Sequence, residues 1–83
     1  MPTVAVVDGV KIQFFYQDHP PPHFHARIGD DSAVIALGLY EVLAGGLPPN
    51  KLNAVLEWAK HHESQLIECW RRASVKQDPG WIE

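Results

Sequence analysis

Three of the five histidines in this chain lie within one short segment, DHPPPHFH, which spans residues 18–25. On an extended strand, His23 and His25 point to the same side, because side chains alternate between the two faces. Two imidazoles at this spacing can share one metal ion, since a zinc–nitrogen bond is about 2.0–2.1 Å long. A stiff run of prolines could return His19 or Asp18 as a third ligand. The segment therefore predicts a divalent transition-metal site, with His19, His23 and His25 as the candidate ligands.

Other residues extend this candidate site toward catalysis. Arg27 follows on the same strand face, where it could neutralise a phosphate or carboxylate. Three protein ligands with an open fourth position are typical of catalytic zinc, and a neutral histidine can also transfer protons near pH 7. A hydrogen-bonded structural cluster around the prolines explains the same residues without any ligand, so whether the chain is an enzyme stays open. The candidate functional cluster comprises Asp18, His19, His23, His25, Arg27 and, from a later helix, His62.

The elements that must position these residues begin with strands. Residues 4–7 and 10–16 are β-branched and aromatic runs around Asp8-Gly9, which is a strong signal for a type I′ hairpin turn. The prolines at 20–22 interrupt the sheet, since proline has no backbone N–H to donate. Strands are then predicted at 23–28 and 32–37, and a short fifth at 41–44. On the first of these, Phe24, Ala26 and Ile28 form the apolar side that should face a helix.

From about residue 50 to residue 73 the apolar spacing changes to that of a helix, with two prolines at its entry. The predicted fold class is therefore α+β, with a small antiparallel sheet of three to five strands packed on one long C-terminal helix. We expect a single domain over residues 1–75 and a loosely ordered tail over 76–83. Glu63 lies on the apolar stripe of the helix, and its role is left open.

A single helix covers only one face of a sheet, so the other face must meet water, a ligand or another subunit. Phe15 on that face and Trp58, off the apolar stripe of the helix, are the candidate residues of a partner interface. Our first hypothesis is therefore a protein-interaction module that binds a second copy or another protein through the uncovered face. The alternative is a metal-binding or histidine-based hydrolase or nuclease centred on residues 18–25.

Composition excludes several other classes. Seven Lys and Arg against ten Asp and Glu give a net charge of −3, which argues against direct binding to a nucleic-acid backbone. One cysteine excludes an internal disulfide and a cysteine-rich zinc ribbon. No signal peptide and no apolar run of about 20 residues are present, so we expect a soluble, cytoplasmic protein with no membrane partner.

The segment D-H-x-P-P-H-F-H-A at residues 18–26 resembles the signature of a small bacterial family, domain of unknown function 4160 (DUF4160). The helix residues L-E-W-A at 56–59 and the later Trp70 also resemble members of that family, so the resemblance covers roughly residues 1–75. It implies a short hairpin, the histidine segment and a closing helix, but no established activity. It also implies a two-gene unit, such as a toxin–antitoxin pair, which would act through protein–protein contacts.

Overall fold

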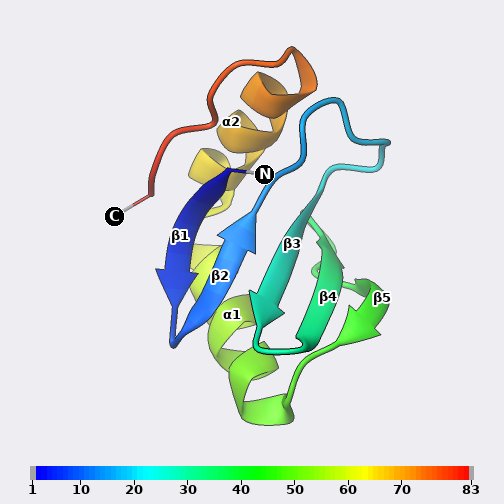
Figure 1. Ribbon diagram of the computed structural model, residues 1–83, viewed down its shortest axis with the longest axis vertical. Coiled ribbons are helices and arrows are strands. Elements are labelled where there is room, and N and C mark those ends of the chain that lie inside the picture. Colours follow the sequence, from blue (N-terminus) through cyan, green and yellow to red (C-terminus); the bar gives the residue numbers. More distant parts are fainter. Residues whose placement is uncertain (1, 83) are drawn as a thin grey trace.

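The computed structural model describes residues 2–82, which form five strands followed by two helices. The strands make one antiparallel sheet in the order in which they occur along the chain. Figure 1 shows both helices on the same face of this sheet, which confirms the predicted α+β class. The elements are β1 (Thr3–Val7), β2 (Val10–Gln13), β3 (His23–Ile28), β4 (Asp31–Ala36), β5 (Val42–Gly46), α1 (Pro49–His61) and α2 (Glu63–Ser74).

The turn between β1 and β2 has the predicted form. Asp8 and Gly9 have φ angles of 51° and 81°, and both central residues of a type I′ turn require positive φ. Lys51 of α1 donates to the Asp8 carbonyl at 3.0 Å, so the first helix contacts the tip of this hairpin.

Strand β2 ends earlier than the pattern of residues 10–16 predicts, at Gln13 rather than Tyr16. The chain leaves the sheet after Phe14, and Gln17, with a φ of 53°, donates its backbone N–H to Ala73 of α2 at 3.0 Å. Tyr16 lies beyond the strand and is 47% exposed, whereas Phe14 is buried.

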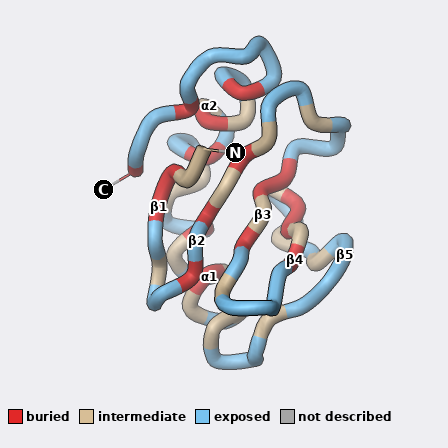
Figure 2. Tube along the Cα trace, viewed as in Figure 1, coloured by how far each residue is buried: buried red, intermediate tan, exposed pale blue. Residues whose placement is uncertain are grey.

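The core lies between the sheet and the helices, where Figure 2 shows buried stretches in the first four strands and both helices. Phe24 and Ala26 of β3 are fully buried, and Ile28 packs against the core, as the alternation predicts. The face of β2 and β3 that points away from the helices, here called the open face, carries Lys11, Gln13, His25 and Arg27.

The prediction of one long C-terminal helix is wrong, because the helix is broken at His62. The backbone N–H of His62 bonds to Ala59 at 3.1 Å, three residues back, instead of to Trp58, four residues back. The Trp58 carbonyl accepts the Nδ1–H of the His62 ring at 2.7 Å instead. The i to i−4 hydrogen-bond ladder is interrupted at this residue, where α1 ends and α2 begins.

The segment after α2 forms no helix or strand over residues 76–82, yet it packs on the domain. The backbone N–H of Ile82 donates to Val4 of β1 at 2.7 Å, and the Ile82 side chain is only 6% exposed. In Figure 1 this red segment runs down beside β1. Neither α1 nor α2 has the length and apolar character needed to cross a membrane.

Candidate functional site

One carboxylate oxygen joins the two histidines of β3. Asp18 Oδ2 lies 2.8 Å from His23 Nε2 and 3.0 Å from His25 Nε2. The three atoms that could bind a metal all lie within 4.8 Å of one another. We refer to Asp18, His23 and His25 as the triad.

The strand and the loop before it bring the triad together. His23 and His25 are the first and third residues of β3, so the strand itself aligns their rings. Asp18 comes from the loop over residues 14–22, where the backbone N–H of His19 donates to Asp18 Oδ1 at 2.8 Å. That bond occupies one carboxylate oxygen and leaves Oδ2 for the histidines. The loop is tied to the end of β4 by the N–H of Leu37, which donates to Pro22 at 2.9 Å.

Aromatic rings enclose the two histidines differently. The His25 ring stacks on Phe15, with centroids 3.9 Å apart and planes 7° from parallel. His23 packs against Trp70 of α2 at a centroid distance of 5.0 Å and is 7% exposed. We expected both rings on the uncovered side of the sheet, but the loop and Trp70 bury His23, so that only His25 borders the open face.

The surroundings of Asp18 keep its side chain ionised. Partial burial alone would raise the pKa of this carboxyl, but hydrogen bonds from His25, the His19 backbone and His23 outweigh burial and lower the pKa to about 2. Near neutral pH, Asp18 therefore offers only hydrogen-bond acceptors to the two rings.

Both ring nitrogens of His23 lie beside hydrogen-bond acceptors. Its Nδ1 lies 2.7 Å from the Pro21 carbonyl, which can only accept, so Nδ1 carries a proton. A neutral ring then has a lone pair on Nε2, which faces the Asp18 carboxylate at 2.8 Å. Two acceptors at this distance repel each other. Either a second proton on His23 or a cation bound between the two groups removes the conflict.

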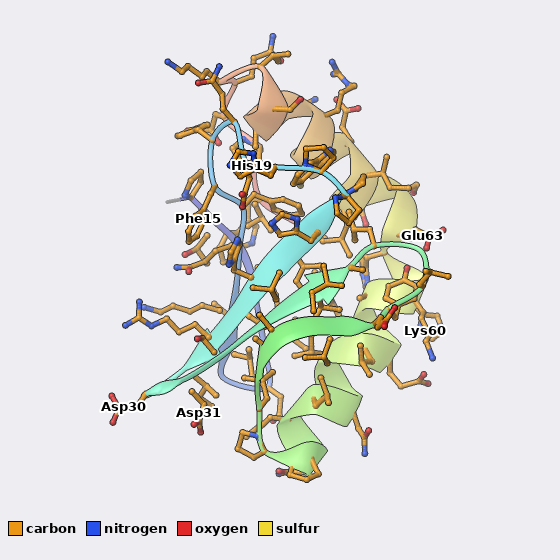
Figure 3. The ribbon with its side chains drawn as sticks, turned by 90° about the vertical axis from the view of Figure 1, so that its right-hand side faces the viewer. Phe15, His19, Asp30, Asp31, Lys60 and Glu63 are labelled. Carbon is orange, nitrogen blue, oxygen red and sulfur yellow. The ribbon has the colours of Figure 1, made fainter. Side chains whose placement is uncertain are left out.

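The other predicted site residues lie outside the triad. The His19 side chain is exposed, and the residue reaches the triad only through its backbone. Arg27 is exposed on the open face, two residues beyond His25. The His62 ring stacks on Trp58 at 4.8 Å, and Trp58 is half-buried against the core. Figure 3 shows Phe15 on the sheet side of the molecule, away from the helices.

The structure gives Glu63 a partner that sequence analysis missed. The Tyr40 hydroxyl donates to Glu63 Oε1, so the acid on the apolar stripe bonds to a phenol rather than to a cation. Burial, this hydrogen bond and the nearby negative charge raise the pKa of Tyr40 to about 12. Trp70, which covers His23, was not among the predicted site residues. Both contacts join residues at least 23 positions apart, so no local spacing could indicate them.

A family model described as a domain of unknown function (DUF4160) matches residues 9–71, which include the triad and most of both helices. No curated protein and no solved structure matches the chain.

Proposed function

The chain belongs to the DUF4160 family, and we propose that it binds a divalent transition-metal ion through Asp18, His23 and His25. The observation that carries the proposal is the contact between His23 Nε2 and the ionised Asp18 at 2.8 Å, where two acceptors meet unless a cation or a proton lies between them. Asp18, His23 and His25 would hold the ion through one carboxylate oxygen and the two Nε2 lone pairs.

The spacing of the donor atoms supports this choice. Two ligands of one tetrahedral zinc are roughly 3.3 Å apart when each bond is about 2.0 Å. The two contacts with Asp18, at 2.8 and 3.0 Å, are slightly shorter than this, and all three donor atoms lie within 4.8 Å of one another, so a shift of the two rings would admit an ion. The bond from His23 Nδ1 to Pro21 is the kind of outer contact that fixes the ring and tautomer of a metal-binding histidine. Two histidines and one carboxylate form the donor set of many hydrolytic zinc and non-haem iron sites.

We further propose metal-dependent hydrolysis as the activity. An ion with three protein ligands keeps an open position and lowers the pKa of a water bound there, which supplies a nucleophile near pH 7. The chain itself positions the ligands, with Asp18 held by His19, and borders the site with Phe15 and the half-buried His25. Access therefore comes from the open face, because Trp70 and the loop cover His23.

The first test is the metal content of protein purified without a histidine tag, measured by inductively coupled plasma mass spectrometry. We expect close to one zinc, iron, nickel or manganese per chain in the wild type and in His19→Ala, and a loss of at least tenfold in Asp18→Asn and His25→Ala. His61→Ala is the matched control, since His61 is an exposed helical histidine. Circular dichroism confirms that each variant is folded.

Two results would overturn the metal site. One is a wild-type protein that carries no metal and takes up none at micromolar concentrations. The other is unchanged metal uptake by folded Asp18→Asn. In either case the triad is a hydrogen-bonded structural cluster.

A protein partner is the second candidate function, and the observation that favours it lies at the sheet edge. Strand β5 ends the sheet, is exposed along most of its length (Figure 2), and carries Leu43 at 46% exposure, with Leu39 in the preceding turn at 82%. Unpaired strand edges bind other strands readily. Self-association through β5, measured by sedimentation equilibrium, should weaken at least tenfold in Leu43→Ser. Self-association through β5 would be contradicted if the wild-type protein stayed monomeric when its concentration in this experiment was raised 100-fold.

A further inference from the structure

Two hollows lie next to each other on the open face. The larger, about 470 Å³, lies between the turns that follow β1 and β3, and the smaller, about 180 Å³, reaches His25 and Phe15. Gln13 and Arg27 line both hollows, so together they form one groove that leads to the exposed edge of the triad.

The groove contains two cations that face each other across strands. Lys11 and Arg27 are direct partners in the β2–β3 register and are both exposed on the open face. Like charges at directly opposed positions destabilise a sheet. The chain has ten acidic residues and seven basic ones. Acidic residues that could have paired with Lys11 and Arg27 are therefore not scarce in this sequence.

No carboxylate compensates the two charges within residues 2–82. Lys51, Arg71 and Arg72 form ion pairs there, whereas Lys11 and Arg27 form none. Asp30 is the acid that lines the groove, and Figure 3 shows it at the tip of the β3–β4 turn, at the far end from His19. The two cations are therefore available to an anion from solution.

We propose that this groove binds the phosphate group of a phosphorylated small molecule, which is the substrate class of the metal site proposed above and rests on that function. A phosphate monoester carries a charge of about −1.5 to −2 at pH 7, which matches the two opposed cations. Lysine and the forked guanidinium of arginine offer only donors, as phosphate oxygens require.

The positions of Arg27 and His25 on β3 assign them different roles, with Arg27 binding the phosphate and His25 belonging to the metal site. Arg27 lies two residues beyond His25, which is roughly 6.6 Å along a strand. The phosphate on Lys11 and Arg27 is therefore an anchor, and the bond placed at the triad is another bond of the same molecule. Arg27 is a positioning residue on this assignment.

Binding is tested on the full chain after metal removal with EDTA, with inorganic phosphate and phenyl phosphate as probes. Amide chemical shifts are followed by nuclear magnetic resonance at constant ionic strength, against chloride. We expect saturable shifts at Lys11 and Arg27 in the wild type, affinity reduced at least tenfold in Lys11→Gln and Arg27→Gln, and no change in Lys60→Gln, a lysine on the helix side (Figure 3). Absence of saturable binding, or unchanged affinity in Arg27→Gln, overturns the proposal.

The metal-free design keeps the two proposals distinct. Phosphate binding together with failed metal uptake supports the groove and overturns the metal site. Metal uptake that depends on Asp18, together with no phosphate binding, supports the metal site and overturns the phosphate site in the groove. Folding is checked by thermal unfolding at low salt, where Lys11→Gln should raise the melting temperature because it removes the opposed charge, whereas Lys60→Gln should not.

Discussion

At the scale of single residues, the loop determines which groups meet. The histidine at position 23 has an acceptor at each ring nitrogen, the Pro21 carbonyl and the Asp18 carboxylate. The paired histidines of β3 were predictable from their alternation. The choice of Asp18 over His19 was not, because it depends on how the loop turns and on the bond from the His19 backbone to Asp18.

The hydrogen bonds to Asp18 make part of the free energy of unfolding depend on pH in the acidic range. The pKa of Asp18 is lowered from 3.8 to about 2 in the folded chain, so the ionised form stabilises the fold above pH 3.8, and this contribution is lost as the pH falls through 2. Asp18→Asn in metal-free protein should reduce the free energy of unfolding at pH 7 by about 1.5–3 kcal/mol, as for other hydrogen bonds to charged groups. Urea unfolding should show this difference shrinking between pH 4 and pH 2. A difference that stays constant over this range would contradict the assignment.

Tyr40 gives a prediction at the other end of the pH scale. Its pKa is raised from 10.0 to about 12, so the protonated phenol stabilises the fold below pH 10, and that contribution is lost as the pH rises through 12. Tyrosinate absorbance should therefore show a transition near pH 12 in the wild type that is missing in Tyr40→Phe. Glu63→Gln should shift the transition to lower pH, because it removes the nearby negative charge.

At the scale of elements, local signals predicted the strands better than the helices. Asp8-Gly9 and the alternation in β3 are short-range patterns, and both have the predicted conformation. The break at His62 carries no glycine or proline that would indicate it. It coincides with the contact of the His62 ring with the Trp58 carbonyl, which the apolar spacing of residues 50–73 cannot indicate.

The pairing of β4 with β5 depends on one glycine. Gly45 has a φ of 69°, and a Cβ there would lie 2.1 Å from the Ser32 carbonyl oxygen, a backbone atom that cannot move aside. Gly38 has a φ of 88° with nothing within 4 Å of a Cβ, so it serves as the matched control. Gly38→Ala should cost about 1–2 kcal/mol of unfolding free energy from strain alone. Gly45→Ala should cost clearly more in the same urea titration, and equal costs would show that the close approach is unimportant.

At the scale of the whole molecule, the last described residues complete the core. Ile82 is buried and bonded to β1, although the sequence predicted a loose tail over residues 76–83. The run Asp78-Pro79-Gly80 has no periodicity, so nothing local shows that a later side chain returns to the core. The overall α+β arrangement was predictable because it depends on summed patterns rather than on single contacts.

Shortening the Ile82 side chain tests whether the segment over residues 76–82 packs on the domain. Ile82→Ala should lower the free energy of unfolding by about 2 kcal/mol, at the lower end of the range for buried isoleucines. Trp81→Ala is the control, since Trp81 is 58% exposed, and its effect should stay within about 0.5 kcal/mol. Equal effects in chemical denaturation would mean that the segment does not pack on the domain in solution.

The packing of the segment over residues 76–82 on the domain also makes Cys69 a reporter of the detachment of that segment. Cys69 is 3% exposed, its thiol donates to the Pro79 carbonyl at 3.4 Å, and burial raises the pKa of the thiol. A thiol-alkylating reagent must therefore wait until the segment that carries Pro79 lifts away. When opening is fast and reversible, the ratio of the alkylation rates in native and unfolded protein gives the free energy of that motion. Alkylation of the single cysteine thus reports the detachment of the C-terminal segment without any engineered label.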